Sequence, residues 1–302
     1  MTEAAPETRC GFIAVIGAPN AGKSTLVNAL VGAKVSIVSR KVQTTRMPIR
    51  GIAIEGTSQL VFIDTPGIFA PRRRLDRAMV GAAWGGAGDA DIVVVLIDAA
   101  KGLEEDAERI LGGLDATRMP LVLALNKIDR VKKEHLLELA RQLNERAPFT
   151  RTFMIAALTG YGVGDLKSYL AGAVAPGPWH YPEDEISDIP MRLLAAEITR
   201  EKLYDRLHDE LPYQATVETT DWTEKKGAIR IEQTIYVARD SQKSIVLGHG
   251  GAMIKQLSMQ ARRELSGILE KPVHLFLHVK VREGWENDPE RYRELGLDFP
   301  KE

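Results

Sequence analysis

The chain has 302 residues, of which 44% are hydrophobic and 27% charged, the composition of an ordinary folded protein of about two domains. Its formal net charge of −1 means that any site for a polyanion must be local. No apolar run approaches the roughly 18 residues of a membrane-spanning helix, the N-terminus lacks the apolar core of a secretory signal, and the single cysteine, Cys10, cannot form an internal disulfide. A reducing compartment, the cytoplasm, is therefore expected.

The first half of the chain alternates short apolar strands with helical patterns. Strands are predicted at 11–17, as a pair within 50–67 joined by a turn at 56–58, and at 91–99, 120–129 and 151–160. Helices are predicted to begin near residue 23 and to span 74–84, 103–114, 133–146 and 163–174. Buried strands that alternate with helices predict an α/β domain whose mostly parallel sheet is covered by helices on both faces.

The second half has a different order of elements. A helix is predicted at 192–207, then two alternating strands at 213–223 and 228–239, a glycine turn, a helix, and a last strand at 272–281, which together indicate an α+β domain. A proline-rich, acidic stretch before it is predicted to be a semi-rigid linker. The predicted boundaries are a tail at 1–8, a first domain at 9–176, the linker at 177–190, a second domain at 191–285 and a C-terminal tail at 286–302.

The stretch between the first strand and the first helix fits the phosphate-loop pattern G-x-x-x-x-G-K-[ST]. Glycines let backbone N–H groups turn toward an anion, and the helix N-terminus adds unpaired donors. Lys23 offers a positive charge to the outer phosphates, and the Ser24 hydroxyl is a ligand for Mg²⁺. The alternative is a plain strand-to-helix turn, and the loop alone does not distinguish ATP from GTP. The predicted nucleotide contacts are Gly17, Ala18, Pro19, Asn20, Ala21, Gly22, Lys23, Ser24 and Thr25.

A second motif, "FIDTPG", follows the phosphate loop in the order and at the spacing that a nucleotide site requires. Asp64 ends an apolar strand, where its carboxylate would lie beside the phosphates and reach Mg²⁺ through water. Gly67 has no side chain, so its N–H can approach the terminal phosphate. The alternative is a common Pro-Gly turn. The predicted contacts here are Asp64, Thr65, Pro66, Gly67 and Ile68.

A third motif, "LNKID", selects the base. It places Asn126, Lys127 and Asp129 at the end of an apolar strand, and ligands of open α/β sheets bind at strand C-termini. The Asp129 carboxylate can accept hydrogen bonds from the N1–H and the exocyclic amine of guanine, whereas adenine has no such donor pair. The alternative is a polar strand end that begins the next helix.

The motifs GAPNAGKS, QTTR, DTPG and NKID occur in the order that is typical of the translation-factor-related GTPases, which this chain resembles. The longer stretch "SRKVQTTR" narrows the resemblance to one family of these GTPases. The chain resembles the bacterial Era GTPases over about residues 9–300. The resemblance implies a P-loop GTPase domain with a mixed sheet, followed by a smaller α+β type II KH domain. It also implies that a threonine closes on Mg²⁺ and the γ-phosphate; of Thr44 and Thr45 we choose Thr45, because it directly precedes an arginine, as the matching threonine does in related GTPases.

In such GTPases the loop after the last strand contacts the base and usually reads Ser-Ala-Leu. Here it reads Ala156, Ala157 and Leu158, so the hydroxyl is missing, but the N–H of Ala157 can still reach the guanine O6. We expect little loss of affinity. The predicted Mg²⁺ ligands of the whole site are Ser24, Thr45 and Asp64.

The attacking water lacks its usual partner. Many GTPases orient it with a glutamine at the position of Ile68, so hydrolysis should be slow without help. Asn20 lies where potassium-stimulated relatives place an ion-coordinating asparagine, and we hypothesise that K⁺ stabilises the developing charge there. The arginines 72–74 are interpreted as a partner-facing surface rather than a catalytic finger. The predicted catalytic residues are Lys23, Asn20, Thr45 and Gly67.

In the second domain a G-x-x-G turn precedes a helix, which is how KH domains clamp about four nucleotides of single-stranded nucleic acid. The alternative is a plain turn with a helix cap. Residues 191–285 hold 15 Lys and Arg against 13 Asp and Glu, so RNA affinity should depend on stacking and base-edge hydrogen bonds more than on counterion release. The predicted RNA contacts are Lys243, Gly248, His249, Gly250, Gly251, Lys255, Arg262 and Arg263.

The resemblance implies a monomeric switch that binds GTP and GDP with Mg²⁺, hydrolyses GTP, binds small-subunit (16S) ribosomal RNA near its 3′ end and assists assembly of the 30S subunit. The main alternative is a GTPase whose C-terminal module recognises a protein or the inner face of the cell membrane, as a peripheral membrane protein. A metabolic phosphotransferase is disfavoured by Asp129, because guanine readout by N-K-x-D is rare in kinases.

Overall fold

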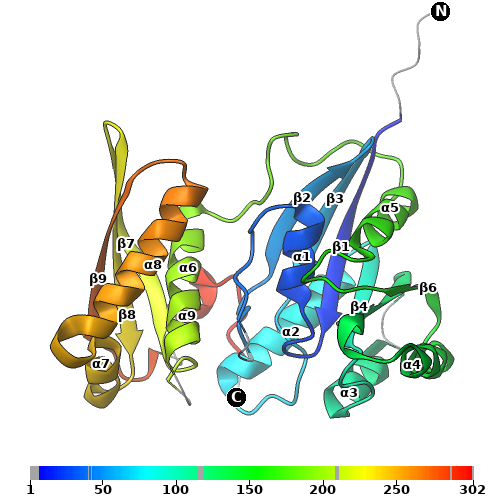
Figure 1. The fold of residues 1–302 in the computed structure, drawn as a ribbon, viewed down its shortest axis with the longest axis horizontal. Helices are drawn as coiled ribbons and strands as arrows, with labels where there is room; N and C mark the ends of the chain where they lie inside the picture. Colours follow the sequence, from blue (N-terminus) through cyan, green and yellow to red (C-terminus); the bar gives the residue numbers. More distant parts are fainter. Residues whose placement is uncertain are drawn as a thin grey trace, which may run out of the picture. The chain divides into compact units, whose positions relative to one another are not determined.

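The computed structural model divides the chain into two compact units (Figure 1). The residues that it describes are 7–39, 41, 43–114, 118–207, 211–285 and 288–300. The first unit holds residues 1–36, 45–188 and 295–302, and the second holds 37–44 and 189–294. Residues 37–44 therefore belong to the second unit, although they precede the linker in the sequence by more than a hundred residues.

The first unit is built on a six-stranded mixed sheet with the strand order β2-β3-β1-β4-β5-β6. Only β2 is antiparallel to its neighbour among these strands. The central strands are continuous apolar runs with both faces buried, as the sequence predicts. The strand bounds are β1 (Arg9–Gly17), β2 (Ile49–Glu55), β3 (Ser58–Asp64), β4 (Ile92–Asp98), β5 (Leu121–Asn126) and β6 (Phe149–Met154).

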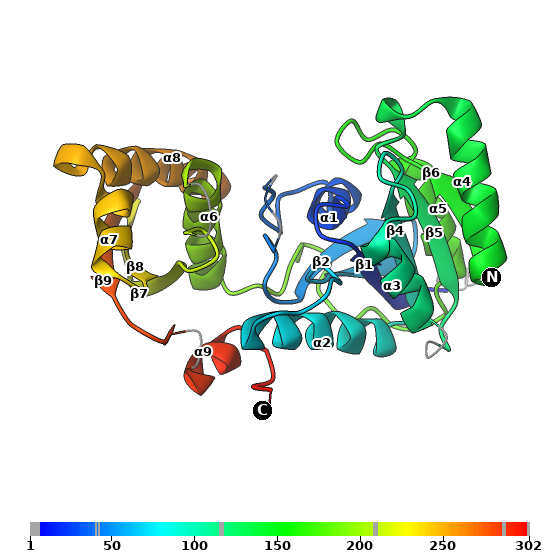
Figure 2. The same ribbon diagram turned by 90° about the horizontal axis from the view of Figure 1, so that it is seen from below.

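Helices cover both faces of this sheet, which confirms the predicted α/β class. One buried cluster joins Leu26 of α1 and Leu166 of α5 to Ile13 of β1, and another joins helices α2, α3 and α4 to the opposite face through residues such as Ile16. Figure 2 shows α1 and α2 on opposite sides of the strands. The helix bounds are α1 (Lys23–Val31), α2 (Arg74–Gly88), α3 (Glu105–Leu114), α4 (Lys133–Arg146) and α5 (Val163–Ala173).

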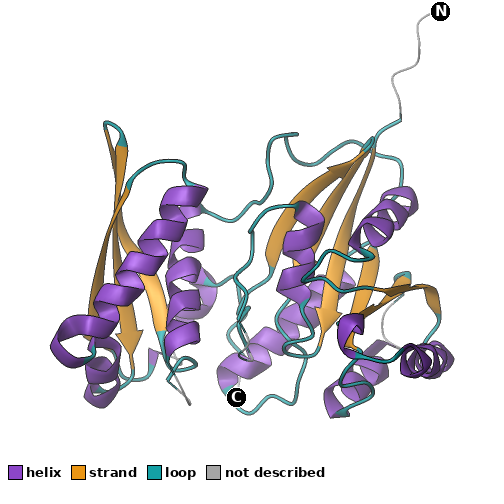
Figure 3. Cartoon of the chain, in the orientation of Figure 1, coloured by secondary structure: helices purple, strands orange, loops and turns teal. Residues whose placement is uncertain are grey.

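The second unit is a three-stranded sheet with helices packed on one face (Figure 3). Strand β8 pairs antiparallel with β7 and parallel with β9, and Leu203, Val246 and Leu257 bring α6, α7 and α8 into one core with the sheet. The predicted α+β class is confirmed. The bounds are α6 (Met191–Arg206), β7 (Thr216–Lys225), β8 (Ala228–Val237), α7 (Asp240–Leu247), α8 (Ala252–Ile268), β9 (Val273–Val281) and α9 (Pro289–Glu294).

Two helices of this unit have no counterpart in the sequence prediction. The apolar segment before the glycine turn forms the short helix α7, in which Val246 is the buried residue, so it carries no helical periodicity to detect. Helix α9 lies within the predicted C-terminal tail, where Tyr292 is buried. No helix in the described part of the chain is long and apolar enough to cross a membrane.

Val38, Lys41 and Thr44 form hydrogen bonds with helix α6 or with the residue that follows it. The Val38 N–H donates to the Glu201 carboxylate at 2.8 Å, and the Arg200 guanidinium donates to the Thr44 carbonyl at 2.6 Å. Lys41 also donates to the carbonyl of Leu207. These bonds explain why this loop groups with the second unit.

Candidate nucleotide-binding site

The phosphate loop connects β1 to α1 with its backbone turned by two residues of positive φ. Asn20 has a φ of 61° and Gly22 a φ of 101°, and asparagine and glycine are the residues that adopt this region most readily. The Lys23 ammonium is buried under the loop and donates to the carbonyls of Gly17 and Ala18, both at 3.0 Å. The loop is therefore folded around the charge that would meet the phosphates.

Glycine is required where the "DTPG" segment passes the phosphate loop. A Cβ on Gly67 would lie 2.9 Å from the Pro19 ring, so only glycine brings this backbone so close. The next residue, Ile68, donates its N–H to the Gly17 carbonyl at 3.1 Å, and its side chain is fully buried in the core. Ile68 therefore contributes backbone position and packing, not a polar group for an attacking water.

The three predicted Mg²⁺ ligands lie together. The hydroxyls of Ser24 and Thr45 are 2.8 Å apart, and the Thr45 hydroxyl donates to the Asp64 carboxylate at 3.4 Å. The Thr44 hydroxyl instead donates to the Lys41 carbonyl within the second unit, so the structure brings Thr45 rather than Thr44 to the site.

The charged groups around the three predicted Mg²⁺ ligands suit a cation that is bound to phosphates. Burial lowers the pKa of Lys23 to about 8, against the opposing effect of Asp64. Burial also raises the pKa of Asp64, against the nearby hydroxyls and Lys23, and its Oδ1 atom is buried without a hydrogen-bond partner. Hard divalent cations bind carboxylate and hydroxyl oxygens together with substrate phosphates, so Ser24, Thr45 and Asp64 suit Mg²⁺.

The base loop is joined to the phosphate loop by the side chain of Asn126. Its amide donates to the Ala21 carbonyl at 2.7 Å, and its carbonyl oxygen accepts the Ala157 N–H at 3.0 Å. Asn126 thus holds together two loops that follow different strands. A Cβ on Gly22 would lie 2.4 Å from the Asn126 amide nitrogen, so glycine is needed there for a second reason.

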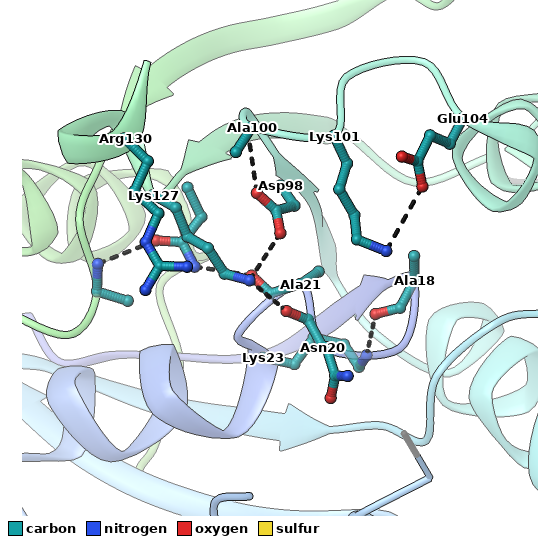
Figure 4. Close-up of polar contacts among 12 residues, drawn as sticks. Ala18, Asn20, Ala21, Lys23, Asp98, Ala100, Lys101, Glu104, Lys127 and Arg130 are labelled. Carbon is teal, nitrogen blue, oxygen red and sulfur yellow. Dashed lines mark hydrogen bonds and ion pairs between the residues drawn. The ribbon is translucent and has the colours of Figure 1, made fainter. Parts of the chain in front are cut away.

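Lys127 makes a further bridge (Figure 4). Its ammonium donates to the Asn20 carbonyl at 2.7 Å and to the Asp98 carboxylate at 2.6 Å. Asp129 follows in the short 3-10 helix η1 (Ile128–Arg130), and its side chain is 53% exposed, open to a base. Among the loop residues 156–158, Ala157 is buried while Leu158 points outward, 82% exposed.

Sequence reasoning missed Asp98. Its residue type and its place at the end of an apolar strand are the same signal that identified Asp64, but no named motif contains it. The arginines 72–74 lie at the start of α2 and do not extend this site. The backbone N–H groups of Arg72 and Arg73 donate to the Asp76 carboxylate. The guanidinium carbon of Arg74 lies 4.8 Å from the centroid of the Phe299 ring.

The G-x-x-G turn of the second unit directly precedes helix α8, as predicted, and it follows helix α7, which was not predicted. Gly248, Gly250 and Gly251 all have positive φ, and a Cβ on Gly248 would lie 2.7 Å from that of Met253. A Cβ on Gly250 or Gly251 would meet nothing within 4 Å, so these two glycines are needed for backbone conformation alone. The predicted basic residues lie on the two helices that the turn joins: Lys243 on α7, and Lys255, Arg262 and Arg263 on α8.

Comparisons with known proteins match both domains of the chain. A family model described as 50S ribosome-binding GTPase matches residues 12–127, and a KH domain model matches residues 210–286. The chain is 65% identical to GTPase Era of Bradyrhizobium sp. strain BTAi1 over 297 residues, which cover 98% of this chain and 96% of that protein. It is 66% identical to GTPase Era of Rhizobium meliloti strain 1021 over 295 residues, 97% of this chain and 94% of that protein.

Two solved structures are similar over nearly the whole chain. One is Era in complex with MgGDPNP and nucleotides 1506–1542 of 16S ribosomal RNA, with a TM-score of 0.91, 36% identity and coverage of 96% of this chain and 99% of that one. The other is a variant of Aquifex aeolicus Era bound to GDP·AlF4⁻, with a TM-score of 0.90, 35% identity and the same coverage.

Proposed function

Because the chain belongs to the GTPase Era family, we propose that it is a GTP-hydrolysing switch that binds the 3′ region of 16S ribosomal RNA through its KH domain and assists assembly of the 30S subunit. The observation that carries the proposal is the presence in one chain of a guanine-nucleotide site and a G-x-x-G turn between two helices. A similar solved Era structure holds a GTP analogue and a 16S fragment together. The proposal can be tested with GTP and a single-stranded RNA that has the 3′-terminal 16S sequence.

The chain's residues divide the reaction among them. The backbone of the phosphate loop and the Lys23 ammonium bind the outer phosphates, and the Gly67 N–H approaches the γ-phosphate. When bound, Mg²⁺ would be held by Ser24, Thr45 and, through water, Asp64, and would offset the charge that develops on the phosphates. Loss of the γ-phosphate removes the group that holds the Thr45 loop closed, which gives the GTP and GDP states different structures.

Turnover should depend on potassium. Ile68 offers no polar group for the water, so we propose that K⁺, coordinated with the help of the Asn20 side chain, supplies the missing stabilisation. GTP hydrolysis in K⁺ is expected to exceed that in Na⁺ at equal ionic strength by about 10²-fold, the effect of one group that stabilises developing charge. An Asn20→Gly variant keeps the positive φ of 61° without strain but removes the amide, so it should hydrolyse GTP equally slowly in both salts. Equal rates for the wild type would end the hypothesis.

RNA binding should depend on the glycine turn. Gly251→Asp places a negative charge and a side chain where the RNA backbone would lie, so binding of a single-stranded RNA with the 3′-terminal 16S sequence should weaken by more than about tenfold. Gly227→Asp is the matched control, because Gly227 also has a positive φ and open space around it but lies in the β7–β8 hairpin. A fluorescence anisotropy titration compares the two variants. RNA binding that survives Gly251→Asp would show that the turn is not the RNA contact, and a wild-type chain that does not bind this RNA would favour a protein or a membrane surface as the partner.

A further inference from the structure

The side chain of Lys127 connects two turns whose backbone has positive φ. Lys127 itself has a φ of 62° and Asn20 a φ of 61°, which are uncommon values for residues other than glycine. The Lys127 ammonium donates to the Asn20 carbonyl at 2.7 Å, so one hydrogen bond joins the apex of the phosphate loop to the base loop. Asparagine adopts this conformation readily, but at Lys127 the surrounding contacts must maintain a backbone conformation that is not favoured locally.

Asp98 supplies the counter-charge that fixes this ammonium (Figure 4). It is the last residue of β4 and lies beside Asn126 in the β4–β5 pairing. Its Oδ2 accepts from the Lys127 ammonium at 2.6 Å, and its Oδ1 accepts from the Ala100 N–H at 3.0 Å. With a side chain only 8% exposed, the carboxylate is held in one orientation.

The backbone after β4 reinforces that orientation. The N–H groups of Lys101 and Gly102 both donate to the Asp98 carbonyl, at 3.0 and 2.9 Å. The carboxylate is thus placed by its own turn before Lys127 reaches it. A lysine has a flexible four-carbon stem, and a charge-assisted bond to a fixed carboxylate orders that stem in advance. Without Asp98 the ordering would have to accompany nucleotide binding, at the expense of affinity.

We propose that Asp98 is a positioning residue for the guanine nucleotide: it holds Lys127 on the phosphate loop, so that the base loop and the phosphate loop are assembled before the nucleotide arrives. Asp98 acts through Lys127 and does not touch the ligand. The inference rests on the proposed function only in that the ligand is GTP or GDP. It assigns a role at the site to a residue outside the three nucleotide motifs.

The test is the dissociation rate of a fluorescent GDP analogue in the full chain with Mg²⁺. Asp98→Asn keeps the size of the side chain and an oxygen for Ala100, but loses the charge that faces Lys127. It is expected to release the nucleotide about tenfold faster, which is the size of a typical coupling between directly contacting charged groups. Glu104→Gln is the matched control and should release the nucleotide at the wild-type rate, because Glu104 is an exposed residue of the following loop that pairs with Lys101 at 3.5 Å.

A double-mutant cycle separates positioning from a merely structural role. If Asp98 acts through Lys127, then replacing Asp98 in a Lys127→Met background should have no further effect on the dissociation rate. If the effects of Asp98→Asn and Lys127→Met on the dissociation rate add in full, Asp98 only caps its own turn and the inference is wrong. The same holds if Asp98→Asn releases GDP at the wild-type rate. A wild-type chain that does not bind GDP would overturn the proposed function itself, so the two failures are distinguishable.

Discussion

An Asp129→Asn variant is expected to lose its preference for GTP and to prefer xanthosine triphosphate. The Asp129 carboxylate would accept hydrogen bonds from the N1–H and the 2-amino group of guanine, whereas an asparagine amide would meet the 2-amino group with a donor. Xanthine has a carbonyl at that position, which the amide can satisfy. Because a site built on hydrogen bonds rejects a mismatched analogue strongly, the ratio of the two affinities should change by roughly 10⁴.

The structure makes this substitution a clean test. Asp129 lies in the short helix η1, its side chain is 53% exposed, and its ion-pair partner is Arg130 at 3.9 Å, so the change disturbs no core packing. Isothermal calorimetry with GDP and xanthosine diphosphate measures the two affinities. Asp165→Asn, an exposed residue in the first turn of α5, is the matched control and should leave both unchanged. A variant at Asp129 that still prefers the guanine nucleotide would show that another group reads the base.

A Gly22→Ala variant is expected to lose about 100-fold in nucleotide affinity, the size of effect that follows when a buried hydrogen-bond pair is broken. The added methyl would lie 2.4 Å from the Asn126 amide nitrogen, and Gly22 has a φ of 101° that L-residues rarely adopt. Asn126 would have to move, and with it the bonds that hold the phosphate loop to the loop of Ala157. One methyl group should therefore weaken the phosphate and base contacts together.

Gly32→Ala isolates the effect of backbone strain. Gly32 lies at the other end of α1 with a φ of 80°, and a Cβ there would meet nothing within 4 Å. Both variants should lose about 1–2 kcal/mol of folding stability from the positive φ, measured by urea unfolding. Only Gly22→Ala should lose GDP affinity. Comparable losses of affinity in both variants would mean that backbone strain, and not the contact between the new methyl group and Asn126, weakens nucleotide binding.

The sequence predicted the fold where burial is continuous along a strand. Runs such as 92–97 and 121–125 are apolar because both faces of the sheet are covered, and each forms a strand as expected. Helix α7 was not predicted, because one buried residue, Val246, provides no periodic pattern. The membership of residues 37–44 in the second unit depends on long-range bonds to α6, which leave no local signal in the sequence.

The nucleotide site could be predicted where a residue belongs to a motif with a defined chemistry. Lys23, Asp64 and Asn126 are such residues, and the structure brings the loops that carry them together. Asp98 could not be assigned in this way, because its partner Lys127 is 29 residues away and the contact forms only when β4 and β5 are paired. The glycines are intermediate: the pattern requires Gly22, but only the structure identifies Asn126 as the group that excludes a side chain there.

The grouping of residues 37–44 with α6 has a consequence for fragments of this protein. A truncation within the linker would leave those eight residues attached to the nucleotide domain while discarding the helix whose Arg200 and Glu201 hold them. The threonine that follows directly, Thr45, would then be tethered to an unsupported segment. Kinetic constants obtained on such an isolated domain would describe an altered loop, so enzymology and RNA titrations should both use the intact polypeptide.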